Sequence, residues 1–215
     1  MDDDNAISVK VVLLGEAAVG KTCIISRFIH DTFDFNVEVT TAAMCVGKSI
    51  TIPEFPGKCI RFEIWDTAGQ EKYRSLTKIF YKDAKVAILV YDITKRKSFE
   101  EIKNYWYNQI KECAPENIII GVAANKSDLF EEEKVSYEEG KKFANEIGAI
   151  FRLTSAYKST GIEELFKAIG CAILDPDFID DDTVVKNKID INENKRKDSV
   201  KLNKEEVKKK KKKCC

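Results

Sequence analysis

The sequence of 215 residues is poor in the residues that build zinc sites. It has one histidine, His30, and its seven cysteines form no C-x-x-C pair. Since structural zinc needs closely spaced Cys and His ligands, no zinc-binding domain is expected. Five cysteines stand singly along the chain, and we expect reduced thiols in a cytosolic globular part.

Long apolar runs and targeting signals are also missing. No run approaches the roughly 20 apolar residues that span a bilayer. The start, MDDD, lacks the basic-then-apolar character of a secretory signal, and Asp2 stands where N-myristoylation needs glycine. A basic core is missing too, because residues 1–175 hold 23 Lys and Arg against 27 Asp and Glu. We therefore expect no nucleic-acid partner.

The strongest signal that is present is the octapeptide GEAAVGKT at residues 15–22. It follows an apolar run, residues 9–14, and precedes a segment with helical spacing, which is the context of a G-x-x-x-x-G-K-[ST] phosphate loop. Its glycines let backbone N–H groups point at a phosphate. Lys21 is expected to reach the outer phosphates, and the Thr22 hydroxyl to ligate Mg²⁺.

Strand-like and helix-like segments alternate from residue 7 to residue 174, which predicts a doubly wound α/β fold. We expect a six-stranded, mostly parallel sheet flanked by about five helices. The expected strands are 7–14, 43–52, 58–65, 86–92, 118–124 and 150–154, and the expected helices are 20–30, 70–81, 98–113, 136–146 and 160–174. The linker PEFPG is too short for a crossover helix, so the second and third strands should form an antiparallel hairpin at the sheet edge.

The character of the chain changes near Asp175. Residues 176–215 are rich in Lys, Asp and Asn without a sustained apolar period, and we expect a disordered tail. The expected organisation is a short extension, 1–6, a globular domain with the phosphate loop, 7–175, which we expect to be monomeric, and the tail, 176–215.

A second motif, WDTAGQ at residues 65–70, ends the third expected strand. Its acidic residue should face the phosphate loop at the carboxyl edge of the sheet, where such folds bind ligands. Asp66 is suited to hold Mg²⁺ through water, Gly69 to let the backbone approach the γ-phosphate, and Gln70 to orient an attacking water.

A third motif, NKSD at residues 125–128, follows another buried strand. Asp128 can accept hydrogen bonds from both N1–H and the exocyclic amine of guanine, while Lys126 lies along the ring and Asn125 braces the loop. Adenine lacks that donor pair and would leave the carboxylate unpaired, so the motif favours GTP over ATP.

These three motifs in this order resemble the Ras superfamily of small GTPases over about residues 7–174. Residues 10–16 (KVVLLGE), 63–65 (EIW), 73–76 (YRSL) and 89–94 (LVYDIT) are similar to the Rab family, with the early-endosomal Rab five subgroup as the nearest group. The resemblance places the switch threonine at Thr40, as a third Mg²⁺ ligand beside Thr22 and Asp66. It implies as nucleotide-binding residues Gly15, Ala17, Ala18, Val19, Gly20, Lys21, Thr22, Cys23, Phe33, Thr40, Gly69, Asn125, Lys126, Asp128, Ser155, Ala156 and Tyr157, with Phe33 packing on the guanine.

The activity that this resemblance implies is hydrolysis of GTP to GDP and phosphate by direct attack of water. The catalytic residues would be Gln70, Lys21, Thr40 and Gly69. Intrinsic turnover would be slow, with an arginine supplied by an activating protein. An exchange factor and effectors are implied as further partners, since release of the Thr40 and Gly69 contacts after hydrolysis resets a switch.

The sequence departs from the family pattern at several positions. Thr41-Ala42 stands where Ile-Gly is usual, Tyr157 stands where lysine is usual, and the turn at residues 53–57 is longer than typical and is expected to lengthen an exposed loop. Of the aromatic triad on Rab effector surfaces, Trp65 and Phe80 match, but the third position is Cys45. Trp65 has the outward parity of Arg61 and Glu63, which favours an exposed partner anchor.

The tail ends in six lysines, residues 208–213, followed by Cys214 and Cys215. Behind a Rab-like domain these look like a double geranylgeranylation signal with polybasic support. An escort protein with geranylgeranyl transferase and a GDP dissociation inhibitor are then implied partners. The implied location is the cytosolic face of endosomal or vesicle membranes.

Two alternatives belong to other classes. A GTP-binding recruitment module with little intrinsic hydrolysis is favoured by Ala17, Thr41 and Cys45 and opposed by Gln70 and Thr40. A metabolic P-loop kinase is opposed by the NKSD motif and by the lack of a substrate-binding insert.

Overall fold

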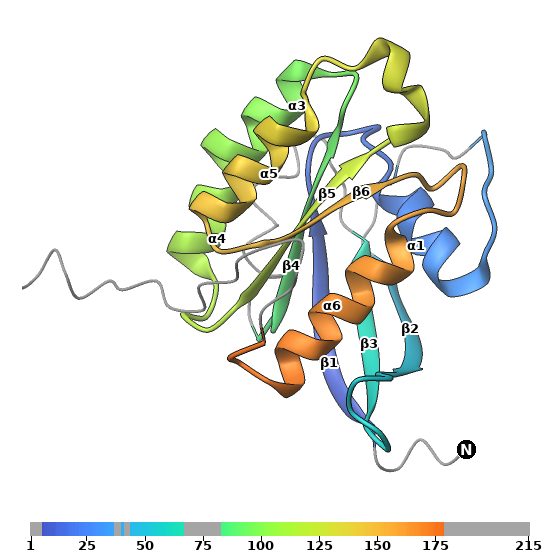
Figure 1. Cartoon of the computed structure of the whole chain (residues 1–215), viewed down its shortest axis with the longest axis vertical. Coiled ribbons are helices and arrows are strands. Elements are labelled where there is room, and N and C mark those ends of the chain that lie inside the picture. The colour runs from blue at the N-terminus through green and yellow to red at the C-terminus, as the bar shows by residue number, and fades with distance from the viewer. Residues whose placement is uncertain (1–5, 37–39, 41–43, 67–82, 179–215) are drawn as a thin grey trace, which may run out of the picture.

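The computed structural model describes residues 6–36, 40, 44–66 and 83–178 (Figure 1). Its strands are β1 (Ile7–Leu14), β2 (Met44–Thr51), β3 (Cys59–Asp66), β4 (Val86–Asp92), β5 (Ile119–Asn125) and β6 (Ile150–Thr154). Its helices are α1 (Lys21–His30), α3 (Arg96–Glu101), η3 (Ile102–Trp106), α4 (Tyr107–Cys113), η4 (Ser127–Glu132), α5 (Tyr137–Glu146) and α6 (Ile162–Leu174). Within these ranges no helix is both long enough and apolar enough to cross a bilayer.

The six strands form one sheet in the order β2-β3-β1-β4-β5-β6. Every neighbouring pair is parallel except β2 and β3, which run antiparallel at the edge. The expected fold class and the expected edge hairpin are therefore confirmed. β4 is buried at every residue, because a central parallel strand is covered on both faces and must be apolar throughout.

Two layers of side chains cover the sheet. On one face α1 and α6 pack against the strands, with Phe28 stacked on Phe166 at a centroid distance of 3.7 Å. On the other face the continuous α3-η3-α4 segment and α5 contribute Phe99, Trp106 and Phe143. The sheet is thus held between helices on both sides, which leaves its strand ends to carry the site.

The carboxyl ends of the parallel strands meet at one edge of the sheet. Asp66, Asp92 and Asn125 are the last residues of β3, β4 and β5 at that edge, and residues 15–20 and Ser155 directly follow β1 and β6. In folds of this kind ligands bind at that edge. Segments more than 130 residues apart in the sequence therefore supply one site.

Most expected elements agree with the observed ones within two residues. The expected helix at 98–113 begins two residues earlier, at Arg96, and contains a π-helical turn, Ile102–Trp106, in its middle. The short 3₁₀ helix Ser127–Glu132 was not predicted. The expected helix at 70–81 lies outside the described residues.

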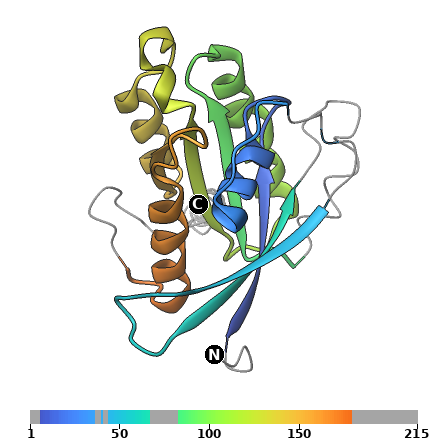
Figure 2. The same cartoon turned by 90° about the vertical axis from the view of Figure 1, so that its right-hand side faces the viewer.

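The hairpin turn at residues 53–57 is exposed at every residue except Phe55, as expected, and apolar side chains fix it to the core. Ile52 is buried and packs on α6, where a Cβ added at Gly170 would come within 2.4 Å of its Cδ1. Phe55 is half-buried against the same core, and its N–H donates to the carbonyl of Ile52. Figure 2 shows the turn beside the C-terminal end of α6. The turn is therefore exposed as expected, with Phe55 as its one partly buried residue, whereas Ile52, which ends the expected second strand, belongs to the core.

Candidate nucleotide site

The phosphate loop depends on glycine at both ends. Gly15 has φ +151° and Gly20 has φ +98°, where other residues are strained. A Cβ at Gly15 would lie 2.2 Å from the Val90 carbonyl oxygen, and one at Gly20 would lie 2.3 Å from Nδ2 of Asn125. Because both contacts leave no room for a methyl group, the loop can pack against β4 and β5 only with glycine at these positions.

Lys21 begins α1 and is buried within the loop. Its ammonium donates to the carbonyls of Gly15 at 2.9 Å and Glu16 at 2.8 Å. Burial lowers the pKa of Lys21 to about 8, an effect that the negative charges of Asp66 and Glu16 partly offset. The loop thus encloses a desolvated cation, which an anionic ligand would stabilise.

Three oxygen atoms converge beside Lys21. The Thr22 hydroxyl donates to Oδ2 of Asp66 at 2.7 Å and lies 2.9 Å from the Thr40 hydroxyl, which is 3.4 Å from the same carboxylate oxygen. Such hard oxygen ligands suit Mg²⁺, which is commonly held by one or two carboxylates together with substrate phosphates. Within the described residues no group of three His, Cys, Asp or Glu side chains could hold a metal by itself. The donor set therefore fits Mg²⁺ that is shared with a phosphate.

The loop after β5 is tied to the phosphate loop and to the loop after β6. Asn125 donates to the carbonyl of Val19 at 2.8 Å and accepts from the Thr154 hydroxyl at 3.2 Å. The Ser155 hydroxyl donates to Oδ1 of Asp128 at 2.5 Å. These contacts hold the Asp128 carboxylate at the far end of the site from Lys21.

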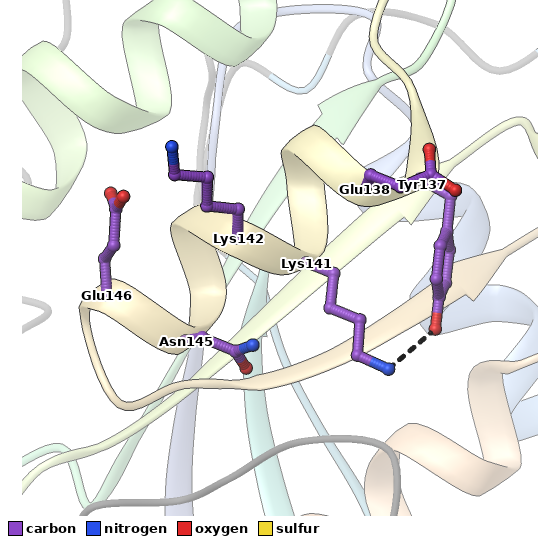
Figure 3. A pocket seen from close by; sticks show the side chains of 6 residues that line it. All are labelled: Tyr137, Glu138, Lys141, Lys142, Asn145 and Glu146. Carbon is purple, nitrogen blue, oxygen red and sulfur yellow. Dashed lines mark hydrogen bonds between the residues drawn. The ribbon is translucent and has the colours of Figure 1, made fainter.

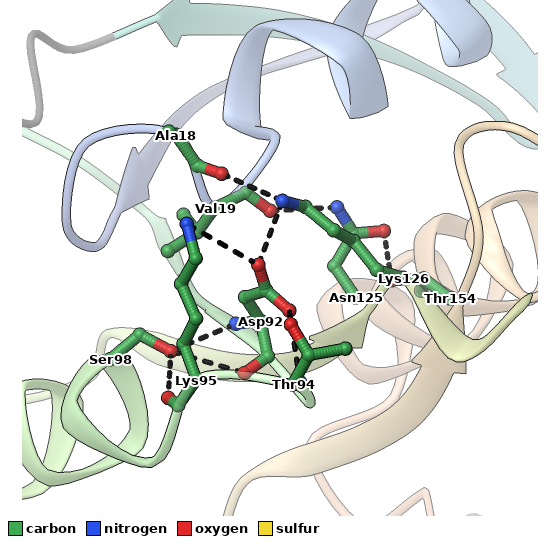
Figure 4. Close-up of polar contacts among 9 residues, drawn as sticks. All are labelled: Ala18, Val19, Asp92, Thr94, Lys95, Ser98, Asn125, Lys126 and Thr154. Carbon is green, nitrogen blue, oxygen red and sulfur yellow. Dashed lines mark hydrogen bonds and ion pairs between the residues drawn. The ribbon is translucent and has the colours of Figure 1, made fainter. Parts of the chain in front are cut away.

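Asp92, which the sequence reasoning missed, is buried at the end of β4 and supports Lys126 (Figure 4). Its Oδ2 lies 2.7 Å from the Lys126 ammonium, which also donates to the carbonyl of Ala18 at 3.0 Å. Its Oδ1 accepts from the backbone N–H and the hydroxyl of Thr94. The signals for it in the sequence were an acidic residue at the end of an apolar strand and its place in the Rab-like stretch at residues 89–94.

A second residue that the sequence reasoning missed is Arg27 of α1. Its Nε donates to the carbonyl of Ala156 at 2.9 Å, and its Nη1 donates to the carbonyl and the carboxylate of Asp31. The guanidinium therefore fixes the backbone of the loop after β6. Nothing in the local sequence pattern indicates a contact between residues 129 positions apart.

These groups surround one cavity of about 570 Å³, within the range of small-molecule sites. The predicted residues that line it are Ala17, Ala18, Gly20, Lys21, Thr22, Cys23, Phe33, Thr40, Asn125, Lys126, Asp128, Ala156 and Tyr157. Gly15, Val19, Asp66 and Ser155 lie outside the lining but make the polar contacts given above. Asp34, Phe35 and Leu129 line the cavity without having been predicted.

Several predicted residues lie elsewhere. Gly69, Gln70, Phe80, Cys214 and Cys215 lie outside the described residues. Cys45 is exposed on β2, directly opposite Trp65 on β3. Trp65 has the expected parity but is half-buried, packs against the core and has the Lys10 ammonium 5.0 Å from its ring centroid. It is therefore less exposed than a free-standing partner anchor.

Another hollow, of about 530 Å³, lies along α5 and is lined by Tyr137, Glu138, Lys141, Lys142, Asn145 and Glu146 (Figure 3). All of these residues belong to one helix, and the Lys141 ammonium donates to the Tyr137 hydroxyl at 3.2 Å. No groups from separate elements converge there, so the cavity at the strand ends is the candidate site.

The fold and this cavity define a P-loop nucleotide-binding protein. Residues 10–175 match the model of the Ras family. Human Ras-related protein Rab-31 is 43% identical over 169 residues, which are 78% of this chain and 85% of the relative. Human Ras-related protein Rab-22A is 41% identical over 157 residues, 73% of this chain and 79% of the relative. Ras-related protein RABD2a of Arabidopsis thaliana is 40% identical over 164 residues, 76% and 79% of the two chains.

The chain therefore belongs to the Ras family and is a small GTPase of the Rab type. The resemblance to Rab proteins near the Rab five subgroup is confirmed, as are GTP binding, GTPase activity and a part in vesicle transport at the level of the family.

Proposed function

We propose that the chain is a Mg²⁺-dependent GTP/GDP switch that recruits effectors to an endosomal or vesicle membrane. The observation that carries this proposal is the convergence of two groups of residues on one cavity. Lys21 and the Thr22, Thr40 and Asp66 oxygens lie at its phosphate end, and Asp128 with Lys126 lies at its base end. Residues 7–175 would form the GTP-binding domain.

Binding in this scheme divides between the two ends. The Lys21 ammonium would exchange its two carbonyl partners for the outer phosphates. Asp128 would accept from N1–H and the exocyclic amine of guanine, held in place by the Ser155 hydroxyl. Thr22, Thr40 and Asp66 would hold Mg²⁺, which when bound neutralises phosphate charge. Asn125 joins the two ends, because its amide connects the phosphate loop to β6.

Hydrolysis would be direct attack of a water on the γ-phosphate, with Gln70 orienting the water and the Gly69 N–H contacting the phosphate. Lys21 and Thr40 would stabilise the transferring group. Among the described residues that line the cavity there is no arginine. Intrinsic turnover is therefore expected to be slow, and an activating protein would supply the missing cation, with an effect of about 10³–10⁵ on the rate.

The switch would act through Thr40. Its hydroxyl lies in the oxygen cluster and would hold Mg²⁺ in the GTP state, and loss of the γ-phosphate would release the segments around Thr40 and Gly69. Effectors would read these segments together with Cys45, Trp65 and Phe80, and an exchange factor would reload GTP. Cys45 gives this surface a smaller side chain than the third aromatic residue of the triad would, so its effectors would differ from those that bind a complete triad.

Membrane attachment would come from the tail. Two prenyl chains on Cys214 and Cys215 give stable anchoring, and the lysines at 208–213 would add about 1 kcal/mol each on an anionic leaflet. An escort protein with geranylgeranyl transferase and a GDP dissociation inhibitor are the expected partners. Replacement of both cysteines by serine should move the protein from the membrane fraction to the soluble fraction of cells, and unchanged membrane association would disprove the anchor.

Single-turnover hydrolysis of GTP with Mg²⁺ tests the catalytic proposal. The full chain should release phosphate slowly, Gln70→Leu should lose most of that release while still binding GTP, and Gln109→Leu on α4 is the matched control with wild-type turnover. Release that is unaffected by Gln70→Leu would refute the role of Gln70. Tight GTP binding without any release by the wild type would favour the recruitment module with little hydrolysis.

A further inference from the structure

Three aromatic rings meet at the guanine end of the cavity, and we name them the aromatic rim: Phe33, Phe35 and Tyr157. Their centroids are 5.0 Å apart for Phe33 and Phe35, 5.5 Å for Phe33 and Tyr157, and 5.5 Å for Phe35 and Tyr157. Phe33 packs edge to face on Phe35 at 88° and on Tyr157 at 65°, whereas Phe35 and Tyr157 are tilted relative to one another at 57°. Each ring touches the other two at distances where aromatic pairs attract.

The rim joins two separate segments of the chain. Phe33 and Phe35 follow α1, whereas Tyr157 follows β6, and all three rings line the cavity. Phe35 is 78% exposed and Tyr157 is 46% exposed, so the two rings touch at the surface and are not brought together by packing in the hydrophobic core. Large aromatic rings that remain this exposed beside a cavity provide apolar surface for a planar ligand.

The loop that carries Tyr157 is held in place by polar contacts from outside the rim. Arg27 donates to the carbonyl of Ala156 and, at 3.4 Å, to that of Tyr157. The Ser155 hydroxyl accepts from the backbone N–H of Lys158, and the Lys158 ammonium lies 5.0 Å from the Tyr157 ring centroid. These contacts fix the position of Tyr157, and the Phe35 ring packs against it.

We propose that Phe35 and Tyr157 close the guanine end of the cavity and slow the release of bound nucleotide. The inference rests on the proposed function, since the occupant is a guanine nucleotide. For the base to leave, the two rings must separate, and the contact between them is lost together with the contacts to the purine. A lysine at position 157, which is usual in the family, cannot form this ring pair. Tyr157 therefore gives this chain a slower exchange than a lysine would.

The closure should not distinguish one purine from another. Every base has a π-face, so stacking and edge contacts with aromatic rings tolerate changes in the base. Discrimination would remain with the Asp128 carboxylate, which Ser155 holds. The preference for GDP over IDP is therefore expected to be the same with and without the rim contact, whereas damage to the Asp128 loop would change it.

The test is the dissociation rate of GDP with a fluorescent ribose label, measured on the full chain at fixed Mg²⁺ after addition of excess unlabelled GDP. Tyr157→Lys and Phe35→Ala should each speed release about three- to tenfold, the range expected for loss of one aromatic pair. The double variant should be no faster than the faster single variant, because both changes remove the same contact. Tyr157→Phe, which keeps the ring, should retain the wild-type rate.

Phe130→Ala is the matched control. Phe130 is 67% exposed but is not among the residues that line the cavity, so its removal should leave the rate unchanged. Unchanged release in both single variants, or effects that multiply in the double variant, would overturn the closure. A change in the ratio of GDP to IDP affinity would do so as well, since it would point to distortion of the base loop. Failure of the wild type to bind the labelled GDP would overturn the proposed function itself.

Discussion

Lys21 is a cation in a place where burial opposes its charge. Its pKa is lowered from 10.5 to about 8 because the side chain is desolvated, and only carbonyl oxygens accept its hydrogen bonds. The free protein therefore loses the charge as the pH rises through about 8. Between about pH 8 and pH 10.5 the unfolded chain binds more protons at this group than the folded chain does. By linkage, the contribution of Lys21 to the free energy of unfolding of the nucleotide-free protein therefore rises with pH across this window.

Binding of GDP should reverse that loss of charge. The phosphates favour the charged amine and raise the pKa of Lys21, so binding above neutral pH must take up a proton. We expect an uptake of about half a proton at pH 8, rising towards pH 8.5, and an affinity that falls as the pH rises. Calorimetric titrations in two buffers of different ionisation enthalpy measure this uptake. Equal heats in both buffers at pH 8 would contradict the prediction, and Lys142→Met on the outer face of α5 is a control with wild-type uptake.

Individual site residues differed in how well the sequence predicted them. Lys21 and Thr22 were predictable because the chemistry of the phosphate loop is encoded in eight consecutive residues. Asp92 and Arg27 were not, since each acts through a contact with a segment far along the chain, Lys126 and Ala156 respectively. Phe35 was missed because a single exposed aromatic residue carries no pattern of its own.

Among the helices, α5 packs so closely on the sheet that it needs a glycine. A Cβ at Gly140 would lie 2.3 Å from Oη of Tyr91 on β4 and 3.0 Å from Cε2 of Phe151 on β6. The Tyr91 hydroxyl is buried without a hydrogen-bond partner among the described residues, and burial raises the pKa of Tyr91. The hydroxyl thus contributes bulk to this contact without a compensating hydrogen bond.

Gly140→Ala should therefore destabilise the protein despite the better helix propensity of alanine. Alanine gains about 1 kcal/mol in a helix, but overpacking costs about 1–3 kcal/mol, and we expect a net loss of about 1 kcal/mol in the free energy of unfolding. In the Tyr91→Phe background the hydroxyl is gone and the loss should shrink. Urea denaturation of the four proteins measures both effects. A stabilising Gly140→Ala in the wild-type background would show that the interface has room for a methyl group.

The strands were more predictable than the turns for the same kind of reason. The run 86–92 is apolar throughout, as a strand covered on both faces requires, and β4 has those bounds. The turn at residues 53–57 contains two prolines and a glycine, which favour an exposed loop. Four of its five residues are exposed, but the preceding residue, Ile52, packs on α6, more than 100 residues later. Local composition carried no information about that contact.

Considered as a whole, the molecule separates its charges. The sequence is neutral, yet residues 1–175 have a net charge of −4 and residues 176–215 a net charge of +4. On an anionic membrane surface the tail would be attracted and the domain repelled. In the proposed function this arrangement keeps the nucleotide site and the effector surface away from the bilayer while the tail holds the protein there.

The site also depends on the whole molecule, because its walls come from segments that follow β1, α1, β5 and β6 and lie far apart in the sequence. A ligand that contacts all of these segments should stabilise the folded state through mass action, by about 4 kcal/mol at a thousandfold excess over its dissociation constant. For a domain of this size that corresponds to a rise in Tm of roughly 10 °C.

We expect this rise with GDP and Mg²⁺ in a thermal unfolding scan of nucleotide-free protein. Removal of Mg²⁺ by EDTA should lower it, because the oxygens of Thr22 and Asp66 would then lose their shared cation. ADP at the same concentration offers the same phosphates but leaves the Asp128 carboxylate unpaired, so it should produce a much smaller rise. Equal rises with GDP and ADP would mean that the phosphate end alone determines binding and that the loop carrying Asp128 does not select the base.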